Sequence, residues 1–172
     1  MDLLSYLGGF VAVSALGIVT TLIMFGVIAR RAVTDKKVAK IGTLIRSGAM
    51  TFLRKEYSIL AAVVAIAFVS FSWLFDLTAA CAYVVGAASS MLAGFIGMRA
   101  ATIANERTTM AAKEDGEYAA FITALCGGSV MGFVVASLGL LGLGGLFYLF
   151  VGQDAHTFIR VITCYGLGAS SI

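Results

Sequence analysis

Long runs of apolar residues alternate with short charged segments along this chain. Residues 3–29, 58–75, 77–98 and 119–151 contain no charged side chain. At 1.5 Å per residue, a helix over the first run is about 40 Å long, enough to cross a hydrocarbon layer of roughly 30 Å with tilt. Each run therefore predicts a transmembrane helix. Because only Asp76 separates the second run from the third, we expect these two to form a tight hairpin.

A cleaved signal peptide is the alternative interpretation of residues 3–29. Signal peptides carry basic residues before an apolar core of about 7–15 residues. This run has no basic residue before it and is longer than such a core. We therefore expect an uncleaved helix.

A helical period precedes the second run, in small and apolar residues at Ile41, Leu44, Ile45, Gly48, Ala49, Phe52 and Leu53. Arg46, Arg54 and Lys55 fall on other faces, which is typical of an amphipathic helix. Because residues 58–75 are barely long enough to cross the membrane alone, this segment is expected to extend their helix at its start.

Residues 99–121 mix alanine with charges of both signs. This composition predicts the solvated ends of two helices, joined by a turn near Asp115 and Gly116. The carboxylates of the segment, including Glu106, are expected in these solvated parts.

The fifth apolar run, residues 158–172, would span only about 22 Å as a helix. A helix that ends at that depth leaves carbonyl groups without hydrogen-bond partners unless other protein covers them. We therefore expect this helix to be truncated and the chain to be the amino-terminal part of a longer one.

Composition supports a membrane class. Hydrophobic residues make up 60% of the chain and charged residues 12%, whereas soluble domains are about a quarter charged. The fold class predicted is an all-α, polytopic membrane helical bundle with four complete transmembrane helices plus a truncated fifth. Residues 1–172 are expected to form part of a single transmembrane domain.

The basic residues predict an orientation. Of the 12 Lys and Arg, all except Arg160 lie between the first and second helices or between the third and fourth. By the positive-inside bias, loops 30–57 and 99–118 are cytoplasmic and the amino terminus lies outside. Arg160 is expected to reach the opposite interface. A phosphate or anionic-lipid site in the first loop is an alternative role, whereas nucleic-acid binding is disfavoured because the loop has no interleaved aromatic residues.

Small residues recur every four positions on two of the predicted helices. Gly86, Ser90 and Gly94 form one stripe, and Gly128 and Gly132 form another. Such stripes are typical of close helix packing. A dinucleotide-binding loop at residues 166–171 is the weaker alternative, since no strand precedes it and no acidic residue follows.

Candidate catalytic groups are scarce. His156 stands alone in a predicted outward loop, and Cys81, Cys126 and Cys164 are widely spaced in apolar runs. This spacing is not that of a zinc site or a redox pair and predicts packing roles for the cysteines. No catalytic, cofactor-binding or metal-binding residue is assigned.

Four motifs in order resemble the membrane-bound, ion-translocating inorganic pyrophosphatases. They are IRSGAMTFLRKEY at residues 45–57, GMRAATIANERT at 97–108, GGSVMGF at 127–133 and GLGASSI at 166–172. The chain departs from that family at Glu106, where a small or apolar residue is expected, and at Cys126, where a polar residue is commoner.

The resemblance implies a homodimeric pump of about sixteen transmembrane helices in the lipid bilayer. Such a pump hydrolyses inorganic pyrophosphate with Mg²⁺ at its cytoplasmic face and drives H⁺ or Na⁺ outward. In the family the early helices form an outer ring, and the substrate-binding residues follow the last motif found here. A small structural or regulatory membrane subunit is the alternative, because the apolar runs carry no carboxylate to relay ions.

Overall fold

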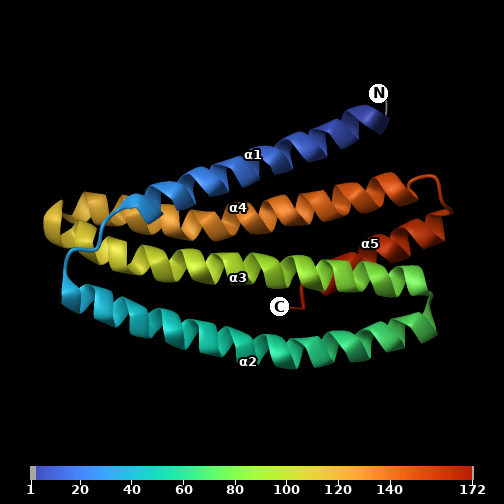
Figure 1. Ribbon diagram of the computed structural model, residues 1–172. Helices are drawn as coiled ribbons and strands as arrows, with labels where there is room; N and C mark the ends of the chain where they lie inside the picture. The colour runs from blue at the N-terminus through green and yellow to red at the C-terminus, as the bar shows by residue number, and fades with distance from the viewer. Residues whose placement is uncertain (1–2, 172) are drawn as a thin grey trace.

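The structure is a computed structural model that describes residues 3–171, with side chains from residue 8 onward, as a bundle of five helices (Figure 1). The helices are α1 (Leu3–Arg30), α2 (Lys36–Leu74), α3 (Leu77–Glu114), α4 (Glu117–Phe150) and α5 (Ala155–Ala169). The first four are long and apolar enough to cross a membrane. Within the described part of the chain there is no strand, so the predicted all-helical membrane fold is confirmed.

Three of the four connections end at an aspartate that caps the next helix. The carboxylate of Asp35 accepts hydrogen bonds from the amides of Lys37 and Val38, and that of Asp76 accepts one from the amide of Ala79. Asp154 caps α5 in the same way. Because the first amides of a helix have no intrahelical partner, these carboxylates determine where α2, α3 and α5 begin.

The α3–α4 connection uses a glycine instead. Gly116 has φ 88° and is the one residue with positive φ in the described chain. A side chain at this angle clashes with its own backbone, so glycine allows the chain to reverse here. The predicted turn at Asp115 and Gly116 is thereby confirmed.

Two predicted features of the helix boundaries are confirmed. Residues 41–53 and 58–74 belong to one continuous helix, α2, of 39 residues, and Phe75 is its C-cap. Helices α3 and α4 run beyond their apolar parts up to the turn between them. The fifth helix begins at Ala155, three residues before the apolar run, because Asp154 caps it there.

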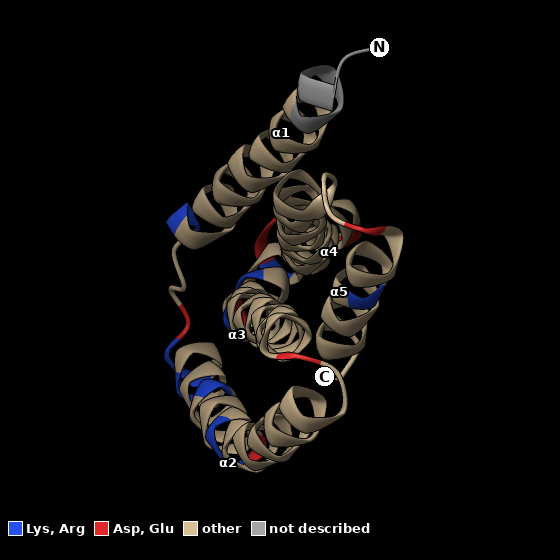
Figure 2. Cartoon of the chain, turned by 90° about the vertical axis from the view of Figure 1, so that its right-hand side faces the viewer, with Lys and Arg blue, Asp and Glu red and all other residues tan. Residues whose placement is uncertain are grey.

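Helix α3 lies in the middle of the bundle, packed against α2, α4 and α5, whereas α1 packs mainly on α4 (Figure 2). One cluster of buried residues, at the α3–α5 contact, includes Tyr83, Val161 and Tyr165. A second cluster joins α1, α3 and α4 through Ile28, Ala100, Ala104 and Val130. The bundle therefore has two small cores along its length.

Helices α3 and α5 cross at a pair of glycines that approach each other's backbones. A Cβ at Gly86 would meet the carbonyl of Tyr165 and the amide nitrogen of Ala169, and a Cβ at Gly168 would meet the carbonyl of Tyr83. Close backbone contact of this kind replaces the hydrophobic driving force that lipid does not supply. The crossing thus depends on the absence of side chains at these two positions.

Tyr165 holds α5 against its second neighbour, α4. Its side chain is 1% exposed, and its hydroxyl donates to the carbonyls of Leu138 and Gly139 at 3.3 and 3.4 Å. The ring lies over Gly142, where a Cβ would overlap it. Since a buried hydroxyl without a partner is costly, these carbonyls orient the ring as well as satisfy it.

The predicted packing stripes are confirmed on α3 and not on α4. Gly86 packs on α5, and Gly94 lies against the hydroxyl of Tyr57 on α2, so the stripe serves two partners. A Cβ at Gly128 or Gly132 would meet no described atom within 4 Å. The face of α4 toward the bundle lies at another helical phase, through Gly127, Val130, Val134 and Ser137.

We predict that Gly86→Leu destabilises the α3–α5 crossing, because a leucine there must push two backbones apart. The expected cost is about 1–3 kcal/mol of unfolding free energy, as for overpacking a core. Gly132→Leu is the matched control, since its Cβ points into open space. Thermal unfolding of both variants in detergent checks this, and equal unfolding temperatures would contradict the crossing geometry.

Candidate functional site

Charged side chains gather toward one end of the bundle, formed by residues 30–57 and 99–118 and called here the basic end. Figure 2 shows Lys and Arg at the end of α1 and along α2. The α1–α2 and α3–α4 connections both lie at this end (Figure 1). This end of the bundle is therefore the first place to look for a polar binding or catalytic site.

Two ion pairs join these connections. Arg31 pairs with Asp115, and the Lys113 ammonium lies 2.6 Å from a carboxylate oxygen of Asp35. The Thr34 hydroxyl donates to Glu114 over 3.1 Å. Pairs this exposed contribute little singly, but together they hold the α1–α2 connection against the α3–α4 turn.

The Asp35 carboxylate has three donors. The hydrogen bond from Lys113, and then the amides of Lys37 and Val38, hold the pKa of Asp35 below its ordinary value of 3.8. Hydrogen bonds to the charged form favour ionisation. The carboxylate therefore stays charged at neutral pH as both a helix cap and an ion-pair partner.

Glu106 occupies an unexpected place. Its side chain is 9% exposed, lies between α2 and α3, and pairs with Arg46 at 2.5 Å. A Cβ at Gly42 on α2 would overlap this side chain, so the glutamate fits between the helices because position 42 is a glycine. The prediction that Glu106 lies in a solvated helix end is therefore wrong. The signal available in the sequence was its spacing, since Thr102, Glu106 and Met110 recur every four residues on the buried face.

At the opposite end of the bundle, one ion pair forms among the residues whose side chains the structure describes. Arg160 on α5 donates to the carboxylate of Asp76 at 3.0 Å, and its guanidinium lies 5.4 Å from the centre of the Phe75 ring. Asp76 caps α3 at the same time. Arg160, which is expected to reach the membrane interface, therefore has a specific partner. Its ion pair with Asp76 joins α5 to the α2–α3 hairpin.

The remaining candidate residues do not converge. His156 is exposed in the first turn of α5. Cys164 is buried and Cys126 half-buried, as expected for packing residues, whereas Cys81 is exposed on the surface of α3. Over the described residues, no three His, Cys, Asp or Glu side chains lie close enough together to hold a metal ion.

This arrangement determines what the described part of the chain can do. Magnesium and phosphate chemistry needs several carboxylates around a metal and free basic groups around the phosphates. Four of the described carboxylates instead each pair with one basic residue, and three cap helices. The paired ones are Asp35, Asp76, Glu106 and Asp115, and the caps are Asp35, Asp76 and Asp154. The described residues do not fit a Mg²⁺ site, and their polar groups position helices.

The family model and the similar proteins found by comparison all indicate the same family. The family model described as inorganic H⁺ pyrophosphatase matches residues 15–172. A K(+)-insensitive pyrophosphate-energized proton pump 2 of Moorella thermoacetica is 34% identical over 91% of the chain. A protein of Clostridium tetani named as a K(+)-stimulated pyrophosphate-energized sodium pump is 33% identical over 94% of the chain. The chain spans 23% of the length of each of these two relatives.

We predict energetic coupling between Arg46 and Glu106. In a double-mutant cycle of Glu106→Gln and Arg46→Gln, the coupling should exceed about 1 kcal/mol, above that of exposed pairs, because the carboxylate is buried. Arg54→Gln replaces Arg46→Gln in the control cycle and should be additive with Glu106→Gln. Unfolding in detergent measures both cycles, and equal coupling in the two would show that the buried pair has no special role.

We also predict a pH dependence at Asp35. Since folding lowers the pKa of this carboxyl, its contribution to stability is complete above the ordinary value of 3.8 and is lost as the pH falls below it. The difference in unfolding temperature between the parent chain and Asp35→Asn should be constant from pH 7 to pH 5 and shrink toward pH 3. A difference that grows on acidification would contradict this assignment.

Proposed function

Because this chain belongs to the inorganic H⁺ pyrophosphatase family, we propose that it is the amino-terminal portion of a pyrophosphate-energised ion pump. The pump couples hydrolysis of inorganic pyrophosphate to transport of protons or sodium across a membrane. The observation that carries the proposal is the family match over residues 15–172, in an all-helical chain with four helices able to span a membrane.

The role proposed for this portion is structural. Catalysis on pyrophosphate depends on positioning and on charge neutralisation by metal ions and basic groups. The described residues offer no metal-binding cluster, and their buried carboxylate, Glu106, is already paired with Arg46. We therefore assign the substrate and Mg²⁺ sites to the rest of the protein, and place residues 1–172 in one transmembrane domain with it.

The proposed orientation has the basic end in the cytoplasm and the amino terminus outside. It rests on the position of 11 of the 12 basic residues at that end. The ion pairs of Arg31 with Asp115 and of Lys113 with Asp35 hold both connections on the same side of the membrane. The pyrophosphate site would then face the cytoplasm, as the resemblance implies.

The proposal for the transported ion and for the assembly rests on the family. A relative named as a proton pump and a relative named as a sodium pump are about equally similar to this chain, at 34% and 33% identity, so the proposal includes either ion. It also includes the homodimer that the family resemblance implies. No part of it involves nucleic acid.

Cysteine labelling tests the orientation. In a Cys81→Ala background, Lys36→Cys at the start of α2 should be protected from a membrane-impermeant thiol reagent in intact cells. His156→Cys, exposed at the opposite end, should be labelled. The Cys81→Ala protein without an added cysteine measures the labelling of the native cysteines that remain. Labelling of Lys36→Cys and protection of His156→Cys would contradict the proposed topology.

Reconstitution tests the proposed division of roles. The whole protein in liposomes should release phosphate from magnesium pyrophosphate and change the internal pH or sodium concentration. Residues 1–172 alone should do neither, because the described part of the chain has no metal cluster and the apolar runs no ionisable relay. Hydrolysis by this portion above that of empty liposomes would contradict the structural role.

A further inference from the structure

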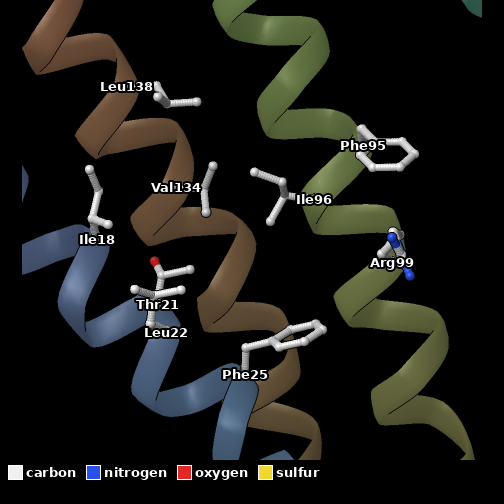
Figure 3. Close-up of a pocket in the computed structure, with 9 residues that line it drawn as sticks. All are labelled: Ile18, Thr21, Leu22, Phe25, Phe95, Ile96, Arg99, Val134 and Leu138. Carbon is white, nitrogen blue, oxygen red and sulfur yellow. The ribbon is translucent and has the colours of Figure 1, made fainter. Parts of the chain in front are cut away.

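A groove runs between α1 and α3 on the surface of α4. Both helices pack on α4 but have little contact with each other, and the space between them is about 480 Å³. This volume falls in the range of about 300–1,000 Å³ typical of ligand pockets. Figure 3 shows Val134 and Leu138 of α4 between the side chains of α1 and α3.

The wall of the groove is almost entirely apolar. Ile18, Leu22 and Phe25 line it from α1, and Phe95 and Ile96 from α3. The Thr21 hydroxyl also reaches it but already donates to the carbonyl of Gly17 at 2.9 Å. A lining with so few free polar groups favours a hydrocarbon chain over a water-soluble ligand.

Among the described residues, Arg99 is the one charged residue that lines the groove. Its guanidinium lies 5.7 Å from the centre of the Phe95 ring and has no carboxylate partner among residues 8–171. Every acidic side chain that forms an ion pair in this part of the chain is paired with another basic residue. Arg99 is therefore free to bind an anion from outside the described chain.

The depth of Arg99 matches that of lipid phosphates. Along α3, Arg99 lies about 33 Å from Leu77, close to the thickness of the hydrocarbon layer. On α2, Arg54 and Lys55 lie at a similar distance, about 29–30 Å, from the other end of the helix. These residues mark one membrane–water interface, at the basic end of the bundle.

We propose that this groove binds an anionic phospholipid, with one acyl chain between α1 and α3 and the phosphate at Arg99. A planar guanidinium suits phosphate oxygens, and a nearby aromatic face leaves its edges free to donate. The basic residues at this end enrich anionic lipids in the leaflet that supplies the ligand. The inference depends on the placement of the chain in a membrane and is independent of pyrophosphate hydrolysis.

Native mass spectrometry of the whole protein tests the headgroup contact. The protein is purified in detergent and equilibrated with equal amounts of palmitoyl-oleoyl phosphatidylglycerol and phosphatidylcholine. We expect the phosphatidylglycerol to be retained about fivefold more, equivalent to about 1 kcal/mol for one basic residue at the interface. Arg99→Gln should abolish this preference, whereas Arg54→Gln, at similar depth on another helix, should keep it.

A second pair of variants tests the acyl chain contact. Leu22→Trp should fill the groove and reduce retention of both lipids, whereas Ile23→Trp, on the adjacent face of α1, should not. Because both positions are exposed, neither variant disturbs a packed core. If Arg99→Gln and Arg54→Gln lower the preference for phosphatidylglycerol equally, general surface charge explains that preference and the proposal is overturned. Absence of bound lipid, the result expected if another protein segment covers the groove, would also overturn the proposal, as would unchanged lipid retention by Leu22→Trp.

Discussion

Inside a bilayer no water is available to the backbone, so each crossing segment must satisfy its amides and carbonyls within its own helix. The structure follows this constraint from end to end. Four helices run through their apolar parts without interruption, and the chain reverses direction only at their polar ends. Proline is absent from the whole sequence, which removes the residue that most disrupts a helix. Aspartates at three connections and Gly116 at the fourth confine the free backbone groups to the ends.

The same solvent changes what holds the helices together. Since lipid is as apolar as leucine, large aliphatic side chains gain nothing by turning inward, and many of them face outward here. The contacts between helices instead use glycine, alanine and hydroxyl groups. The α3–α5 crossing shows two of these contacts close together. Gly86 and Gly168 allow the backbones to approach, and the Tyr165 hydroxyl donates to a carbonyl of α4. Ion pairs add specificity at the two ends, where water and charge are available.

Much of the fold follows from the sequence because lipid makes hydropathy a strong signal. The run lengths, the hairpin at Asp76 and the turn at Gly116 were all predicted from single features. Helical phase was harder to predict. The stripe at Gly128 and Gly132 does not face the bundle, because every face of α4 is apolar and hydropathy does not distinguish them. The burial of Glu106 also escaped prediction. Its spacing with Thr102 and Met110 indicates the buried face, but the space for its side chain is left by Gly42, more than sixty residues away in the sequence.

The candidate chemistry depends on family membership more than on local geometry. Among the described residues, four carboxylates are each paired with one basic residue, and no cluster of carboxylates could hold a metal ion. Single ion pairs position helices, whereas binding of magnesium pyrophosphate needs several carboxylates around the metal. Under the proposed function, the described residues position helices, and the residues that bind substrate and metal belong to the rest of the pump. The most direct measurement is an experimental structure of the whole protein with Mg²⁺ and a non-hydrolysable pyrophosphate analogue. The proposed division of roles predicts that no side chain of residues 8–171 contacts the metal or the phosphates. A carboxylate such as that of Glu106 coordinating Mg²⁺ would contradict it.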